Sequence, residues 1–143
     1  MDAPIRPILK ASDFKNFDYS VLISNTTTNT DLLDSSLVRI LEISERGLVL
    51  KTPKGICSDG HMLMLFVFPG KNEVKMPMAP KNKKIDGMFS ITAKVQKSTP
   101  DGGRFFRVGV EFYQFQTDEW QQFLDCFKNQ QKRINQIIKA VQG

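Results

Sequence analysis

The sequence is poor in the residues that build catalytic and metal centres. Its 143 residues include one histidine, His61, and two cysteines, Cys57 and Cys126, which lie far apart and form no Cys-x-x-Cys pair. Histidine and cysteine alone therefore cannot supply the four ligands of a usual zinc site. No Gly-x-Ser-x-Gly or P-loop pattern occurs, and no two carboxylates form an evident acid–base pair. We expect a protein that is not an enzyme and has no metal or cofactor.

Long apolar runs are also missing. The longest, Met62–Phe68, is about a third of the length that a membrane helix needs. The segment Met1–Lys10 contains two prolines and lacks the apolar stretch of a signal peptide. Two separated cysteines fit a reducing compartment. These features predict a cytoplasmic protein without a membrane span, and the net charge of +5 weakly favours an anionic partner.

The sequence does contain a series of short strand patterns. Residues 1–18 mix prolines with basic residues and predict an extended basic arm. In Ser90–Lys97 and Arg104–Phe112, apolar and polar residues alternate, and Asp101-Gly102-Gly103 between them is typical of a hairpin turn. The segment His61–Phe68 is apolar on both faces, which indicates a strand covered on two sides. Strands without intervening helices predict an antiparallel sheet, and closure into a barrel would remove its edges.

A helix is predicted at about residues 117–141, where Thr117 can cap the N-terminus and basic residues lie near the end. Its apolar residues recur with heptad-like spacing. At about 1.5 Å per residue the helix would outreach the barrel, so we expect its second half to project and pair with another copy. The alternative is that its apolar stripe folds back on the barrel. The predicted oligomer interface is Leu124, Phe127, Gln131, Ile134, Ile138 and Val141.

One segment between two strand patterns carries a family resemblance. Glu42–Gly47 reads Glu-Ile-Ser-Glu-Arg-Gly and resembles the second signature of the PilZ family: Asp or Asn, any residue, Ser, two residues, Gly. The apolar strand ending at Pro69, the strand Ser90–Lys97, the Gly-Val-x-Phe strand ending at Phe112 and the final helix also resemble that family, in the same order. The resemblance implies a mainly β fold over residues 19–143: a six-stranded antiparallel PilZ-type β-barrel with a long C-terminal amphipathic helix.

The resemblance also implies a ligand and the residues that hold it. PilZ domains are bacterial barrels that bind cyclic di-GMP. In that family the signature contacts guanine, its glycine permits the turn, and an Arg-x-x-x-Arg arm holds phosphate and stacks on guanine. This sequence has glutamate at the first signature position, and its nearest match to the arm ends in lysine. The implied cyclic di-GMP site is Arg6, Lys10, Lys15, Glu42, Ser44, Arg46 and Gly47.

Three functions are open at this point. The first is a regulatory domain that binds cyclic di-GMP. The second is a degenerate domain of the same fold that binds no nucleotide and acts on a protein partner, which the missing arginine pair favours. The third is a nucleic-acid-binding barrel, for which Arg104-Phe105-Phe106-Arg107 would have to present a stacking platform. Ordinary strand alternation explains that segment better, so nucleic acid is the least favoured partner.

Overall fold

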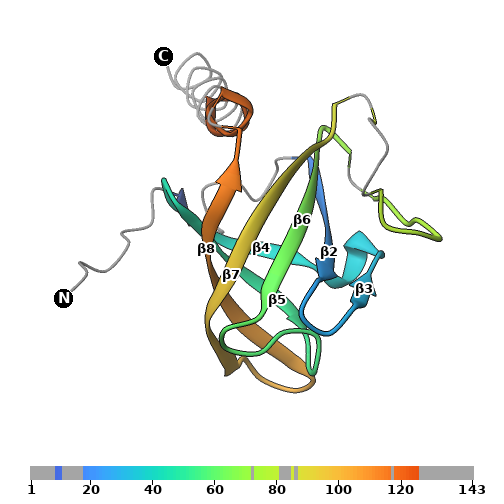
Figure 1. The fold of residues 1–143 in the computed structure, drawn as a ribbon, viewed down its shortest axis with the longest axis vertical. Coiled ribbons are helices and arrows are strands. Elements are labelled where there is room, and N and C mark those ends of the chain that lie inside the picture. Colours follow the sequence, from blue (N-terminus) through green and yellow to red (C-terminus); the bar gives the residue numbers. More distant parts are fainter. Residues whose placement is uncertain are drawn as a thin grey trace, which may run out of the picture.

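The computed structural model describes residues 18–71, 73–80, 85, 87–116 and 118–125, together with the backbone of residues 9–10. Within these residues the fold is one antiparallel sheet in the order β1-β4-β5-β8-β7-β6-β2-β3, shown in Figure 1. Its strands are β1 (Leu9–Lys10), β2 (Tyr19–Asn25), β3 (Thr30–Leu32), β4 (Arg39–Ile43), β5 (Gly47–Pro53), β6 (Met62–Pro69), β7 (Phe89–Pro100) and β8 (Phe105–Phe115). A 3₁₀ turn, η2 (Ser35–Leu37), precedes β4, and residues 118–125 are helical.

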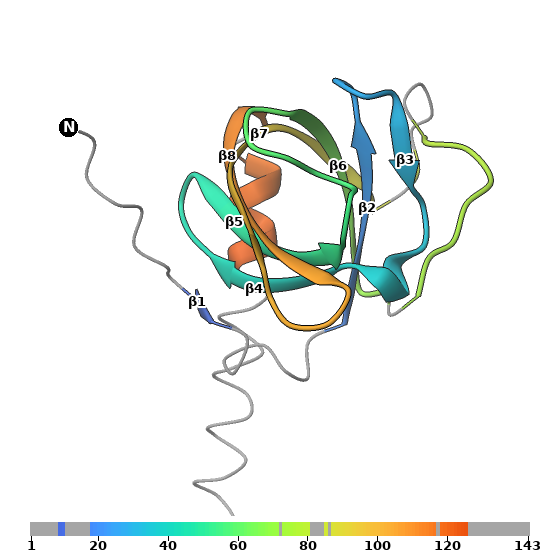
Figure 2. The ribbon, with the colours of Figure 1, turned by 90° about the horizontal axis from the view of Figure 1, so that it is seen from below.

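The prediction of a mainly β, antiparallel fold is confirmed, but the strand count and the closed barrel were wrong. Seven strands of three residues or more and the two-residue β1 form a sheet that curls into a half-barrel, as Figure 2 shows from below. The edge strands β1 and β3 do not pair with each other. The strand β1 lies in the segment that was predicted to be an extended arm, and no strand was predicted at β3.

The strand β3 was missed because side-chain hydrogen bonds, rather than apolar alternation, define its turn. The buried Asn25 at the end of β2 accepts hydrogen bonds from the backbone N–H groups of Thr27 and Thr28, each at 3.1 Å. Asn29 then adopts a left-handed backbone with φ of 56°. Asparagine tolerates that conformation better than most residues. This turn reverses the chain, and Thr30 pairs with Asn25 across the hairpin.

The core lies inside the curl and is closed at one end by the short helix. Trp120, Phe123 and Leu124 of this helix are buried among the inward-facing side chains of the sheet. The rings of Phe112 and Trp120 meet edge to face, with centroids 4.8 Å apart and an interplanar angle of 85°. Such pairs stabilise the fold beyond the area they bury. The predicted helix therefore begins where expected, and its continuation to Val141 lies outside the described residues.

A second, smaller core lies on the outer face of the sheet, over β2 and β6. Leu22, Phe66 and Phe68 are buried there beneath the apolar side chains of a segment that we call the strap, residues 73–80. This confirms that β6 is covered on both faces, since Leu63, Leu65 and Val67 alternate into the main core.

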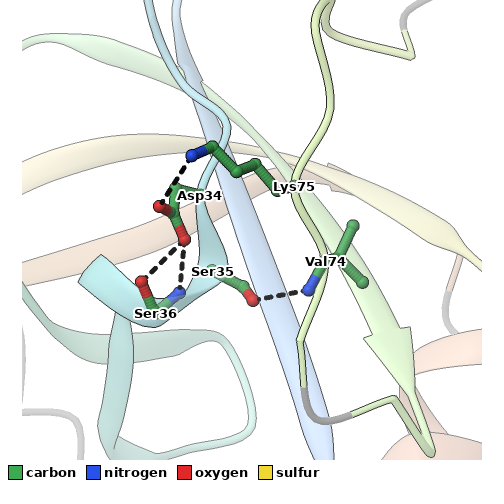
Figure 3. A network of polar contacts seen from close by, with 5 residues as sticks. All are labelled: Asp34, Ser35, Ser36, Val74 and Lys75. Carbon is green, nitrogen blue, oxygen red and sulfur yellow. Dashed lines mark hydrogen bonds and ion pairs between the residues drawn. The ribbon is translucent and has the colours of Figure 1, made fainter.

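Figure 3 shows how the strap is attached beside η2. The N–H of Val74 donates to the hydroxyl oxygen of Ser35 at 2.8 Å, and Lys75 Nζ lies 3.9 Å from Asp34 Oδ2. The other carboxylate oxygen of Asp34 accepts from the hydroxyl and the N–H of Ser36, at 2.7 and 3.1 Å. These bonds favour the charged carboxylate, so Ser36 first and Lys75 to a smaller extent lower the pKa of Asp34.

Candidate nucleotide site on the outer face of the sheet

The predicted signature forms the hairpin between β4 and β5. The N–H and the hydroxyl of Ser44 both donate to the carbonyl oxygen of Gly47, at 3.0 and 2.9 Å. The N–H of Phe112 in β8 donates to the carbonyl oxygen of Arg46 at 2.7 Å. The hairpin is therefore fixed both within itself and against β8.

Gly47 is required for a different reason from the one predicted. Its backbone is not left-handed, so the turn itself does not need glycine. Instead, a Cβ atom at this position would collide with the carbonyl oxygen of Val110 in the neighbouring strand. The absent side chain lets β5 and β8 pair closely, with Gly47 opposite Glu111.

A small cavity lies beside this hairpin. It has a volume of about 150 Å³, and the signature residues Glu42, Ser44 and Gly47 all contribute to its lining. Gln96 of β7 and Gly109 of β8 also line it, and the rest of the wall is apolar, formed by Ile43, Leu48, Val49 and Val110. Sites for whole drug-sized ligands usually measure about 300–1,000 Å³, so this cavity suits one part of a larger ligand.

The first signature residue is held in place by an ion pair. Glu42 Oε1 lies 3.2 Å from the guanidinium of Arg107, which reaches it from β8 across β5. The side chains are 27% and 42% exposed, so both remain accessible to a ligand. A partly exposed pair of this kind adds little stability, but it orients the carboxylate at the cavity wall.

Strand pairing brings one residue of the basic arm to the signature. Lys10 in β1 is the register partner of Glu42 in β4, and Glu42 is in turn opposite Val49 of β5. Across the sheet, Val49 is opposite Gly109 of β8, and Gly109 is opposite Lys97 of β7. This pairing places the backbone of Lys10 beside the signature, while Arg6 and Lys15 lie outside the described residues, so their part in a site stays a prediction.

Arg46 occupies the exposed tip of the hairpin. Its carbonyl oxygen accepts the hydrogen bond from the N–H of Phe112. Neither of the two ion pairs formed among the described residues involves its side chain. Arg46 is therefore an exposed residue one position before the cavity-lining Gly47 and is not itself part of the cavity lining.

The predicted oligomer interface is described at one position only. Leu124 is 3% exposed and packs in the core of its own chain, so it is not available to a second copy. Phe127, Gln131, Ile134, Ile138 and Val141 lie outside the described residues, and the interface stays a prediction there.

The remaining candidate groups have structural surroundings. His61 Nδ1 accepts the N–H of Ser58 at 3.2 Å and lies 3.0 Å from the amide nitrogen of the buried Asn25, so the ring organises the loop before β6. Burial raises the pKa of the Cys57 thiol to about 12. No group of three potential metal ligands occurs in the described part of the chain. Over the same residues, no helix has the length and apolar character to cross a membrane.

The aromatic platform required for nucleic-acid stacking is weakly developed. Phe105 is 37% exposed, but Lys51 Nζ lies over its ring at 5.1 Å from the centroid. Tyr113 is more exposed, at 60%, and was missed because its position in β8 follows ordinary alternation. These two rings are separated by most of the length of β8, which leaves no continuous stacking surface between them.

Comparison with known proteins gives one structural relationship. No protein-family model matches the chain, and no curated protein matches it in sequence. Among solved structures, the chain is similar to the Bacillus subtilis inhibitor of motility, MotI/DgrA, with a TM-score of 0.52 and 14% identity. The match covers 82% of this chain and 51% of MotI/DgrA, so this chain spans about half the length of that protein. At this identity the likeness shows a shared fold.

Proposed function

We propose that this chain is a PilZ-like regulatory domain that binds cyclic di-GMP at the hairpin between β4 and β5. The observation that carries the proposal is the convergence of Glu42, Ser44 and Gly47 on one cavity of the outer face. The same three positions carry the resemblance to the PilZ signature in the sequence. The shared fold with a protein described as an inhibitor of motility adds support for a regulatory role.

The chemistry of the cavity suits a guanine base. A carboxylate accepts hydrogen bonds only, and the Watson–Crick edge of guanine carries N–H donors, so Glu42 complements that edge. Ser44 donates its hydroxyl proton to Gly47, but its oxygen retains acceptor capacity. The cavity volume of about 150 Å³ leaves the rest of a cyclic dinucleotide to lie on the sheet surface.

Calorimetric titration with cyclic di-GMP tests the proposal. We expect saturable binding by the full chain and its loss in Gly109→Val, because valine would occupy the cavity. A Cβ at Gly109 meets only the carbonyl oxygen of Lys97, at 3.8 Å, so the backbone need not move. Ser90→Val is the matched control, since Ser90 is exposed on β7 opposite Phe66 and outside the cavity lining. Absence of heat at high micromolar ligand would rule out the proposal.

A degenerate adaptor domain is the second candidate, and two contacts favour it. The hydroxyl proton of Ser44 is already used by Gly47, and Glu42 is already paired with Arg107. A domain of this kind would act through a protein partner and would show no response to cyclic di-GMP. The titration above therefore separates the two candidates directly.

A further inference from the structure

A second row of side chains crosses the outer face beside the cavity, and it is cationic. Arg39 in β4 is the register partner of Lys51 in β5, and Lys51 is the register partner of Arg107 in β8. Directly opposed residues of antiparallel strands lie on the same face. The residues next to them on these strands, Ile40, Leu50 and Val108, are buried in the core, so the cationic row faces outward.

The positive charge of this row is poorly balanced within the chain. Like charges placed directly opposite each other on neighbouring strands destabilise a sheet. Glu42 pairs with Arg107, but among the described residues no carboxylate lies within ion-pair distance of Arg39 or Lys51. Lys51 contacts the ring of Phe105 instead. An anionic partner would relieve the repulsion between these side chains.

The cationic row lies next to the cavity. Val49 and Gly109 line the cavity. Lys51 is two residues from Val49 along β5, and Arg107 is two residues from Gly109 along β8, a separation of roughly 6–7 Å in each strand. Arg107 also contacts Glu42 in the cavity wall. Lys97, the register partner of Gly109, adds an exposed cation at the other side. A ligand that leaves the cavity over β5 and β8 would therefore meet these cations first.

We propose that Arg107, Lys51 and Arg39 bind the phosphate groups of the nucleotide whose base occupies the cavity. This inference rests on the proposed function and assigns the phosphate contacts to the sheet rather than to the N-terminal arm. Arginine offers a planar fork that binds phosphate through two hydrogen bonds, which fits Arg107, the cation of the row that also contacts Glu42 in the cavity wall. Phosphate contacts from the sheet would allow the chain to bind a cyclic dinucleotide without an Arg-x-x-x-Arg arm.

The test compares charge-neutralising variants by titration with cyclic di-GMP. Arg107→Gln removes one charge-assisted contact and is expected to raise Kd about tenfold or more. Arg107→Lys keeps the charge without the fork and should give an intermediate loss. Lys51→Gln is expected to raise Kd several-fold. The difference in affinity between each variant and the unaltered chain should shrink as salt is added, since screening weakens the attraction that the substitution removes.

Arg104→Gln and Lys71→Gln are the matched controls, because both residues are exposed cations and neither lies in the row or the cavity lining. They should leave Kd within about twofold, and thermal melting should confirm that every variant folds. Unchanged binding in Arg107→Gln and Lys51→Gln, with loss in the double arm variant Arg6→Gln/Lys10→Gln, would overturn the inference but keep the proposed function. No binding by the unaltered chain would overturn both.

Discussion

The hydroxyl group of Ser44 donates a hydrogen bond of 2.9 Å to the carbonyl oxygen of Gly47, and this bond closes the hairpin on which the candidate site is built. Ser44 and Gly47 thus have a structural role in addition to their position in the cavity wall. A sequence signature of this kind can therefore persist for folding alone. Variants of these residues need a stability measurement beside every binding measurement.

Ser44→Ala should lower the free energy of unfolding by about 1 kcal/mol, the usual net worth of one hydrogen bond. The Gly47 carbonyl keeps its bond from the N–H of Ser44, so the hairpin should survive. Urea denaturation measures the change. Ser36→Ala, which removes an exposed hydroxyl beside Asp34, gives a comparison away from the site. A loss above about 3 kcal/mol would mean that the hydroxyl does more than close the turn.

Substitutions at two glycines of the site should have opposite consequences. Gly47→Ala forces a Cβ into the carbonyl oxygen of Val110 and should destabilise the fold by about 2 kcal/mol or more, because β5 and β8 must separate. Gly109→Ala meets only ordinary van der Waals contact and should be neutral or slightly stabilising in a strand. Thermal unfolding of the two variants checks this. Equal melting temperatures would contradict the close approach at Gly47.

The sequence predicted the strands with strong alternation and missed relationships that depend on register. The alternation in β7 and β8 and the two-sided apolar pattern of β6 were enough to place those strands. Gly109 gave no signal as a cavity residue, because its contribution is an absent side chain. The row of Arg39, Lys51 and Arg107 joins three distant segments, so only strand pairing reveals it.

The arm illustrates the same limit. Lys10 lies far from Glu42 along the chain, and the sequence alone does not bring them together. The antiparallel pairing of β1 with β4 nevertheless puts the two residues opposite each other. Short edge strands form where a neighbouring strand offers free backbone groups, and the composition of the segment carries little information about this.

The Cys57 thiol should resist alkylation in the folded protein. The side chain is 4% exposed, and burial raises its pKa to about 12, so almost no thiolate forms near neutral pH. Iodoacetamide labelling followed by mass spectrometry should modify Cys57 only after denaturant is added. The variant Cys126→Ser removes the other cysteine and simplifies the readout. Rapid labelling under native conditions would show that the loop before β6 opens readily.

The same thiol should make the fold sensitive to alkaline pH. In the unfolded chain the thiol ionises near its ordinary pKa of 9.0, whereas in the folded chain it stays neutral up to about 12. The stabilising contribution is therefore complete below about pH 9 and is lost as pH rises towards 12. Between these values, ionisation of Cys57 should lower the free energy of unfolding by about 1 kcal/mol per pH unit. Cys57→Ala should show a shallower decline, and an identical decline would contradict the assignment.

Release of the strap provides the last prediction. The charged carboxylate of Asp34 holds Ser36 and faces Lys75, while Ser35 binds the strap through Val74 (Figure 3). The contacts with Ser36 and Lys75 lower the pKa of Asp34. Their stabilising effect is therefore present above the ordinary pKa of 3.8 and is lost as pH falls below it. Asp34→Asn should reproduce the acidic state at neutral pH. Hydrogen exchange at the amides of Val74 and Met76 should become faster, since both donate across this attachment. Glu73→Gln changes a neighbouring exposed carboxylate and should leave exchange unaltered. Equal protection in Asp34→Asn and the unaltered chain would show that the apolar side chains over Phe66 and Phe68 hold the strap by themselves.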